Sequence, residues 1–316
     1  MRKQSRLATT RHTSFLPLFH VLHALLSLTS CLAMTTIAST AASRLVYGKD
    51  DALFGSLEER QGNLPFGSIL DAGTGLHSLR WIATLHPKGM TKFTAITADK
   101  TMQHNVQVEA DALGISNKGE ILIGNWFDEA TPLQLADEQY DTILADYLIG
   151  AMDGFSPYRQ DQMIAKLAKL LKPGGRLYIV GLEPIPNAAP GDTNVICKVR
   201  QVRDACILLA QHRCYREYPM EWIHRQIETL GDLQLLQSSQ FPILYRHETI
   251  VKQINVGRSK LSLFPTSELA DSMTVLLNDL ERQSLEATQR SPTGRLTLGF
   301  DYVVAAEKRL TTTQEL

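Results

Sequence analysis

The stretch Ser68-Ile-Leu-Asp-Ala-Gly-Thr-Gly75 decides the fold class of this 316-residue chain. Its apolar residues run into two glycines, and residues 76–85 then carry the apolar spacing of a helix. Glycines at the carboxyl end of a strand let the backbone turn tightly and approach a ligand without a Cβ in the way. Such turns also serve close packing. The stretch therefore predicts a strand, turn and helix of an α/β protein, and its companions decide whether the turn is a site.

Further apolar runs follow this unit and alternate with helical patterns, which is typical of a parallel sheet covered by helices on both faces. The expected strands are residues 68–72, 93–98, 120–123, 142–145, 176–180, 233–236 and 302–306. We therefore expect an α/β fold with a doubly wound, mostly parallel seven-stranded sheet.

The best-marked helix is expected between the fourth and fifth strands. Ser156 is placed to cap it, and Lys172-Pro-Gly-Gly175 to end it. Two stretches, residues 192–231 and 246–300, exceed what a minimal sheet needs, and Ser267 is placed to cap a helix in the second. We expect these stretches either to form a lid or to thicken the core, because amphipathic spacing indicates burial and not what is covered.

The amino-terminal segment differs in charge from the rest of the chain. Residues 1–49 contain six Lys and Arg and no Asp or Glu, so a total of −1 leaves −7 for residues 50–316. A basic start, the apolar run 15–33 and the small residues 38–43 follow the order of a removable targeting peptide. We expect an organellar location, in plastid or mitochondrion, after removal of this leader. A secretory leader or a membrane anchor is the alternative, and membrane contact is expected only if the apolar run is retained.

Several classes of protein are excluded by composition and motifs. The acidic body has no basic face interleaved with aromatic residues, so we expect no nucleic-acid partner. The cysteines form no C-x-x-C pair and the histidines lack ligand spacing, so no metal site is predicted. A serine hydrolase and a Walker-type nucleotidase are excluded because neither G-x-S-x-G nor the phosphate-binding loop is present.

Polar residues follow the second and third expected strands at the edge where a doubly wound sheet binds ligands. Asp99 is placed to accept hydrogen bonds from the two ribose hydroxyls of an adenosine ligand, and Asn125 to bind the exocyclic amine of adenine. Trp126 is placed to flank the ring. The alternatives are a solvated loop acid for Asp99 and a core aromatic residue for Trp126.

With these companions, the chain resembles the class I S-adenosylmethionine-dependent methyltransferases. The matching motifs are D-A-G-T-G at 71–75, the acid at 99, Y-D-T-I-L-A-D at 140–146 and L-L-K-P-G-G-R-L-Y-I-V at 170–180. Together they cover about residues 60–185, and the likeness returns at 300–307. The resemblance implies a Rossmann-like methyltransferase fold, with the two long stretches as added helical cap segments, and S-adenosyl-L-methionine as cofactor.

The resemblance also implies roles for the matched residues. The first motif surrounds the methionine part of the cofactor, the acid after the second strand binds ribose, the residues after the third strand bind adenine, and the segment after the fourth strand faces the methyl group and the acceptor. These positions are, in that order, Asp71, Gly73, Thr74 and Gly75, then Asp99, then Asn125 and Trp126, then Asp146 and Tyr147. Asp146 is also expected to bind the cofactor. Asp146 and Tyr147 are the expected catalytic residues on the acceptor side.

The chain departs from the family pattern in two places. Residues 86–92 lengthen the distance from Gly73 to Asp99, which weakens the ribose assignment. Residues 146–153 are not the Asn-Pro-Pro-Tyr type of amide and adenine methylases, and the paired glutamates of arginine methyltransferases are missing. Those acceptors are therefore disfavoured.

The resemblance predicts five segments along the chain. They are a targeting peptide or leader at 1–43, the cofactor-binding core at 44–190, a helical insertion or cap at 191–232, the completion of the sheet with a second helical insertion at 233–309, and a tail at 310–316.

Methyl transfer from a sulfonium asks the protein mainly to hold the acceptor in line, so no metal is required. A base is needed only for a hydroxyl or a protonated amine. The candidates are His77, Asp146, Tyr147, Asp153 and Glu183. His77 has no carboxylate beside it in the sequence to orient it, which favours a local hydrogen-bonding role.

We expect the acceptor to be a small molecule, because the two long stretches are placed to enclose one. Two alternatives come from other classes. A dinucleotide oxidoreductase also uses a glycine turn and an acid, but it normally has a third glycine where Ser78 stands. A methyltransferase-like binding protein would keep the pocket without the activity.

Overall fold

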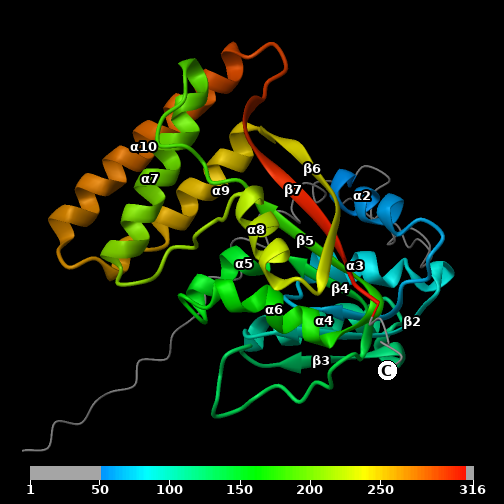
Figure 1. Cartoon of the computed structure of the whole chain (residues 1–316). Helices are drawn as coiled ribbons and strands as arrows, with labels where there is room; N and C mark the ends of the chain where they lie inside the picture. Colours follow the sequence, from blue (N-terminus) through cyan, green and yellow to red (C-terminus); the bar gives the residue numbers. More distant parts are fainter. Residues whose placement is uncertain (1–50, 311–316) are drawn as a thin grey trace, which may run out of the picture.

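A computed structural model of the chain describes residues 51–310 (Figure 1). The predicted leader at 1–43, its apolar run and the residues after 310 lie outside this range. Within residues 51–310, no helix is both long and apolar enough to cross a bilayer. The same range contains no group of three or more His, Cys, Asp or Glu side chains placed to hold a metal ion.

Seven strands form a single sheet in the order β3-β2-β1-β4-β5-β7-β6. Strands β1 to β5 pair in parallel, and β7 runs antiparallel between β5 and β6. The strands are β1 (Gly67–Asp71), β2 (Met90–Thr97), β3 (Gly119–Ile123), β4 (Tyr140–Asp146), β5 (Leu171–Leu182), β6 (Leu233–Tyr245) and β7 (Leu296–Lys308). The predicted doubly wound, mostly parallel seven-stranded sheet is confirmed, with its order reversing between β1 and β4.

Helices cover both faces of this sheet and add a layer beyond one end of it (Figure 1). The helices are α2 (Ala52–Gln61), α3 (Leu76–Ala83), α4 (Lys100–Ala112), α5 (Leu148–Ala151), α6 (Gln160–Leu170), α7 (Asn194–Leu209), α8 (Met220–Leu230), α9 (His247–Arg258) and α10 (Ser267–Arg290). One core joins the sheet to α2, α3 and α4, and the other joins it to α5, α6 and α8.

The strand β1 shows why the central strands read as continuous apolar runs. Ile69 and Leu70 are both fully buried, but they belong to the cores on opposite faces of the sheet. Because helices cover both faces, alternation between apolar and polar residues is not needed. The strand ends with Asp71 at the edge where the chain turns towards α3.

The helices α7, α9 and α10 form a cap with its own apolar core. Strands β6 and β7 are longer than predicted and extend beyond the sheet, so Tyr245 at the end of β6 and Leu296 at the start of β7 lie in the cap core. The predicted cap segment 191–232 is divided, because α8 packs on the sheet through Ile223 and Ile227. The helices α7 and α9 are therefore held over one end of the sheet by the strands themselves (Figure 1).

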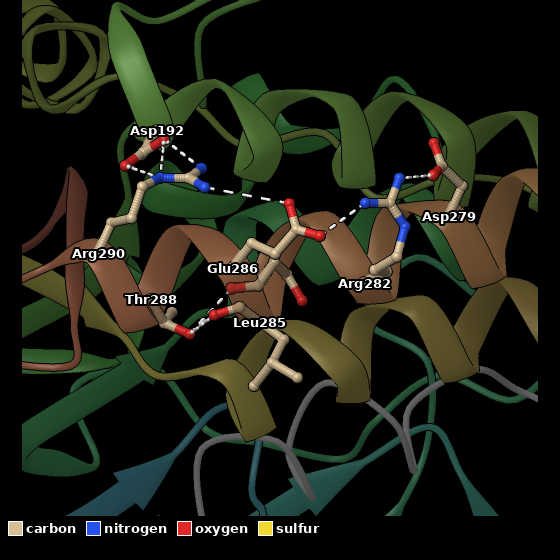
Figure 2. Close-up of polar contacts among 8 residues, drawn as sticks. Asp192, Asp279, Arg282, Leu285, Glu286, Thr288 and Arg290 are labelled. Carbon is tan, nitrogen blue, oxygen red and sulfur yellow. Dashed lines mark hydrogen bonds and ion pairs between the residues drawn. The ribbon is translucent and has the colours of Figure 1, made fainter.

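A chain of ion pairs ties α10 to the start of α7 (Figure 2). Arg282 bridges Asp279 and Glu286 along the helix, and Arg290 bonds Asp192 with nitrogen–oxygen distances of 2.7 to 3.2 Å. These side chains are largely exposed, so solvent screens each pair and its contribution to stability is small. Of these pairs, Arg290–Asp192 joins α10 to another segment, whereas the Arg282 pairs lie within the helix.

Two predicted helix caps are wrong. The helix α6 begins at Gln160, and the hydroxyl of Ser156 instead donates to Asn125 in the loop after β3. The helix α10 does begin at Ser267, but Thr266 is its cap, with a hydroxyl oxygen that accepts from the N–H of Leu269 at 3.3 Å. Ser156 thus bonds the loop after β3 instead of capping the helix.

Candidate functional site

The end of β1 holds two buried polar side chains without partners. Asp71 is fully buried, and neither of its carboxylate oxygens accepts a hydrogen bond from the described residues. The hydroxyl of Thr74 is also buried and unpaired within residues 51–310. Burial raises the pKa of Asp71 to about 6, although nearby Ser78, Thr74 and the N–H of Gly73 partly offset it without completing a hydrogen bond.

The turn that carries these side chains is fixed by its backbone. The N–H of Thr74 donates to the carbonyl of Ile96 and that of Ala72 to the carbonyl of Leu144, both at 2.8 Å, so β2 and β4 hold the turn between them. A Cβ on Gly73 would lie 3.1 Å from Leu148, which shows that this glycine allows close packing of α5. Gly75 precedes α3 and donates its N–H to Ser78 at 3.1 Å.

Asp146, at the end of β4, is a second buried acid at this edge. It is 3% exposed, and burial raises its pKa to about 7. His77 acts in the opposite direction, whereas Asp71 adds to the increase. The edge therefore holds two carboxyls that would both ionise readily beside a cation and resist ionisation without one.

Tyr147 follows Asp146 but turns away towards β7. It has a left-handed backbone with φ 49°, and its hydroxyl donates to Asp301 at 2.8 Å. Burial and the neighbouring acids raise its pKa well above the ordinary value. The proposed catalytic role of this hydroxyl remains a prediction, and its bond to Asp301 would have to be exchanged for one to an acceptor.

His77 has the orienting carboxylate that the sequence did not reveal. Its Nε2 lies 2.8 Å from Asp51, whose other oxygen caps α2 by accepting from the N–H groups of Leu53 and Phe54. Burial raises the pKa of Asp51, but the contact with His77 and the N–H groups of Phe54 and Leu53 together lower the pKa overall. A pair 26 positions apart, brought together by tertiary packing, leaves no local signal in the sequence.

Asp99 is buried and serves as the cap of α4. One of its carboxylate oxygens accepts from the N–H of Met102 at 2.7 Å, and the residue is 1% exposed. The alternative of a solvated loop acid therefore does not hold. Ribose binding by this carboxylate stays a prediction, since part of its bonding capacity already belongs to the helix.

Asn125 and Trp126 fix the loop after β3 to the rest of this edge. The amide of Asn125 donates to the carbonyl of Phe155 at 2.8 Å and accepts from Phe127 and Ser156. The indole N–H of Trp126 donates to the carbonyl of Ala72 at 2.7 Å, and the residue is 7% exposed. Both residues thus have structural partners, and their proposed adenine contacts remain predictions.

A hollow lies where adenine is predicted to bind. Its lining residues are Ala72, Gly73, Ile96, Thr97, Ala98, Gly124, Asn125, Trp126, Leu148, Ala151, Met152, Phe155 and Ser156. The hollow measures about 30 Å³, which is room for a water molecule and not for a purine. The hollow as it stands therefore does not admit an adenine ring.

The remaining predicted bases are engaged elsewhere. Asp153 pairs with Arg213 at 3.4 Å, and Glu183 accepts from the N–H of Met220 at 3.1 Å. Sequence reasoning missed Glu217, a half-buried acid in the segment between α7 and α8 that lies beside α5. No motif surrounds it, so only the fold identifies it.

Comparison with known proteins gives similar solved structures at low sequence identity. No protein-family model and no curated protein matches the chain. Among solved structures, the YcgJ protein from Bacillus subtilis is 16% identical, over 81% of this chain and 97% of that one, with a TM-score of 0.49. A methyltransferase from Thiobacillus denitrificans in complex with S-adenosyl-L-homocysteine is 16% identical, over 78% and 86%, at 0.42. The [4+2]-cyclase SpnF is 15% identical, over 81% of each chain, at 0.46.

At these identities and TM-scores the likeness carries no argument about this chain, and the assignment of the fold depends on the strand order. The seven-stranded sheet, with its switch point between β1 and β4 and its antiparallel β7, is the Rossmann-like sheet of S-adenosylmethionine-dependent methyltransferases. The predicted resemblance to the class I methyltransferases is therefore confirmed at the level of the fold.

Proposed function

We propose that the chain is an S-adenosylmethionine-dependent methyltransferase that passes a methyl group by in-line displacement to a small molecule. The buried, unpartnered carboxylate of Asp71 carries this proposal, together with the hydroxyl of Thr74. An unpaired buried polar group costs about 1 to 3 kcal/mol, so a ligand that pairs with it recovers that free energy. Asp146 on the neighbouring strand makes the edge suited to a cationic ligand.

The residues of this edge would hold the cofactor by charge and hydrogen bonding. S-Adenosylmethionine, when bound, supplies an already activated methyl group. Asp71 would accept from the ammonium group of its methionine part, and Thr74 offers a hydroxyl beside it. Asp99 would accept from ribose, with Asn125 and Trp126 at the adenine end. The protein's contribution to rate is then positioning, worth several kcal/mol when the acceptor is held in line.

Binding by this edge requires the segment 148–156 to move. It closes the adenine-side hollow through Leu148 and Phe155, and the bond from Asn125 to the carbonyl of Phe155 holds it in place. A closed hollow of about 30 Å³ therefore supports an opening step before the ring enters. The expected signature is slow association with an adenosyl ligand.

Calorimetry with the purified chain tests the cofactor directly. We expect S-adenosylhomocysteine to bind and NADH not to bind. Tight binding of NADH with none of S-adenosylhomocysteine would assign an oxidoreductase instead. Incubation with radiolabelled S-adenosylmethionine and fractionated cell extract then tests transfer, and a filled site without any labelled product would indicate a binding protein.

A further inference from the structure

A second cavity, much larger than the adenine-side hollow, lies between the end of β5 and the cap. It measures about 230 Å³ and is lined by side chains of α7, α9, β6 and the segment before α8. Its wall is mostly apolar, through Ile196, Val199, Ile207, Ile250 and Val256. A cavity of this kind suits a small molecule with an apolar body and a few polar contacts.

Glu217 is the acid in this wall that lies nearest the cofactor edge. One of its carboxylate oxygens lies 2.5 Å from where a Cβ on Gly150 would stand, so it touches the backbone of α5. Other residues of α5, Leu148 and Ala151, line the adenine-side hollow. The short helix therefore separates the two spaces, with Glu217 on the cavity side.

The charges of the cavity wall are distributed unevenly. Arg203 donates to Asp204 at 2.7 and 2.9 Å and also bonds Gln253, whereas Arg200 donates to Asn187 at 3.0 Å. Within residues 51–310, the carboxylate of Glu217 has neither a hydrogen bond nor an ion pair of its own. Arg203 acts on Glu217 through its charge and lowers the pKa of that acid, and the third arginine of the wall, Arg216, is exposed.

We propose that this cavity binds the methyl acceptor as an amine with an apolar body, and that Glu217 takes up the proton of the attacking nitrogen. The proposal rests on the proposed function, because it names the substrate class of that site. Tyr215 and Tyr245 line the same cavity, and aromatic rings attract a cationic nitrogen.

The step balances in atoms and charge. A protonated amine gives its proton to the carboxylate of Glu217, and the freed lone pair forms the bond to the methyl carbon. The carbon–sulfur bond breaks as that bond forms, and its electron pair stays on sulfur. Burial raises the pKa of Glu217 to about 7, which brings this carboxyl closer to the basicity of an amine. A hydroxyl nucleophile is disfavoured, since its pKa lies far above that of any carboxylate.

Three probes of similar shape test the cavity: phenethylamine, 2-phenylethanol and 3-phenylpropanoate. Their affinities are measured by calorimetry at pH 7.5, and contact is read as saturation transfer from probe to the ring protons of Tyr215 and Tyr245. We expect the amine to bind more tightly than the other two and to contact both rings. Tighter binding of the acid or the alcohol, or binding of none, would overturn the proposal.

Glu217→Gln and Glu221→Gln form the matched pair of variants. Glu221 is exposed in the first turn of α8 and does not line the cavity. We expect Glu217→Gln to weaken phenethylamine at least tenfold and Glu221→Gln to change it less than twofold. Equal affinity in both variants would remove Glu217 from the site. Failure of the wild type to bind S-adenosylhomocysteine while it binds the amine would overturn the proposed function and leave the cavity assignment standing.

Discussion

The acids near the two ends of strand β4 differ in their hydrogen-bond partners and in the direction of their pKa shifts. Asp141, near the start, accepts hydrogen bonds from the ammonium group of Lys172 at 2.8 and 2.9 Å. It also accepts from the N–H of Ser68 at 2.8 Å and from the hydroxyl of Ser68 at 2.7 Å. These partners outweigh partial burial and lower its pKa. Asp146, at the end, is buried with a pKa raised to about 7. Strand β1 repeats the contrast, because Ser68 at its start is bonded and Asp71 at its end is not.

The contrast distinguishes two edges of the sheet. Acids at the start of the strands are paired and stabilise the fold, whereas acids at the end of the strands lie at the proposed ligand site. A satisfied carboxylate contributes to folding in the free protein, whereas an unsatisfied one lowers stability until something binds. Gly67 is part of the satisfied edge, since it has φ +59° and a Cβ there would lie 2.4 Å from Asp141. Changes at the two edges should therefore affect different quantities.

The pH dependence of stability should show the largest effect. The pKa values of Asp71 and Asp146 are raised to about 6 and 7, so the folded chain holds protons that the unfolded chain has lost. The free energy of unfolding should therefore fall by roughly 4 kcal/mol between pH 5 and pH 8 through these two acids. Asp301 and Glu217, whose pKa values are raised to about 6 and 7, add to the fall. Asp141, with its lowered pKa, acts only at lower pH. Urea unfolding across this range checks the slope, and a rise with pH would contradict it.

Asp71→Asn should weaken cofactor binding without harming the free protein. The amide keeps the shape but removes the charge, so the affinity for S-adenosylhomocysteine should fall about 10- to 100-fold, or roughly 1.5 to 3 kcal/mol. The stability of the free variant at pH 7.5 should equal or exceed that of the wild type, because a buried charge is lost. Calorimetry and thermal unfolding measure the two quantities. An unchanged affinity would take Asp71 out of the site.

Asp141→Asn is the control at the opposite edge, with the reverse expectation. Loss of the charge weakens the pair with Lys172, which is partly exposed, so the free energy of unfolding should fall by about 1 to 2 kcal/mol. Its affinity for S-adenosylhomocysteine should stay within twofold of the wild type. If this variant lost cofactor affinity as Asp71→Asn does, the division between the two edges would fail.

Trp126→Phe should have the smallest effect and sharpen the role of the loop after β3. It keeps most of the buried ring but removes the N–H that donates to Ala72 at 2.7 Å. We expect a loss of about 1 kcal/mol in stability. If Trp126 also flanks adenine, the affinity for S-adenosylhomocysteine should change little, since the phenyl ring still stacks. Loss of affinity greater than tenfold would indicate that the indole itself binds the ligand.

The seven strands could be predicted because each buried strand has a continuous or alternating apolar run. Their lengths were less predictable. Strand β6 continues through Gln237, Ser238, Ser239 and Gln240, which are polar and half-buried or exposed, because backbone pairing with β7 extends it. Pro242 also lies in this strand, as an edge strand allows. No local pattern distinguishes such residues from a loop.

Part of the candidate site could be predicted and part could not. Asp71, Thr74 and Asp146 follow strands whose order the sequence indicates, so their gathering at one edge could be expected. The cap function of Asp99, the partner of His77 and the place of Glu217 depend on groups far apart in the chain. These features depend on tertiary packing, which cannot be predicted from the local pattern of a single sequence.

The sequence by itself determined the fold class and the edge at which a ligand is expected, because backbone periodicity, glycine turns and strand order act over short distances along the chain. Only the tertiary structure decided which acids are paired, since Asp141 meets Lys172 and Asp71 meets no partner within residues 51–310. Burial and pairing arise from side chains that converge from distant segments, and these set the charge, the pKa and the space that a ligand finds.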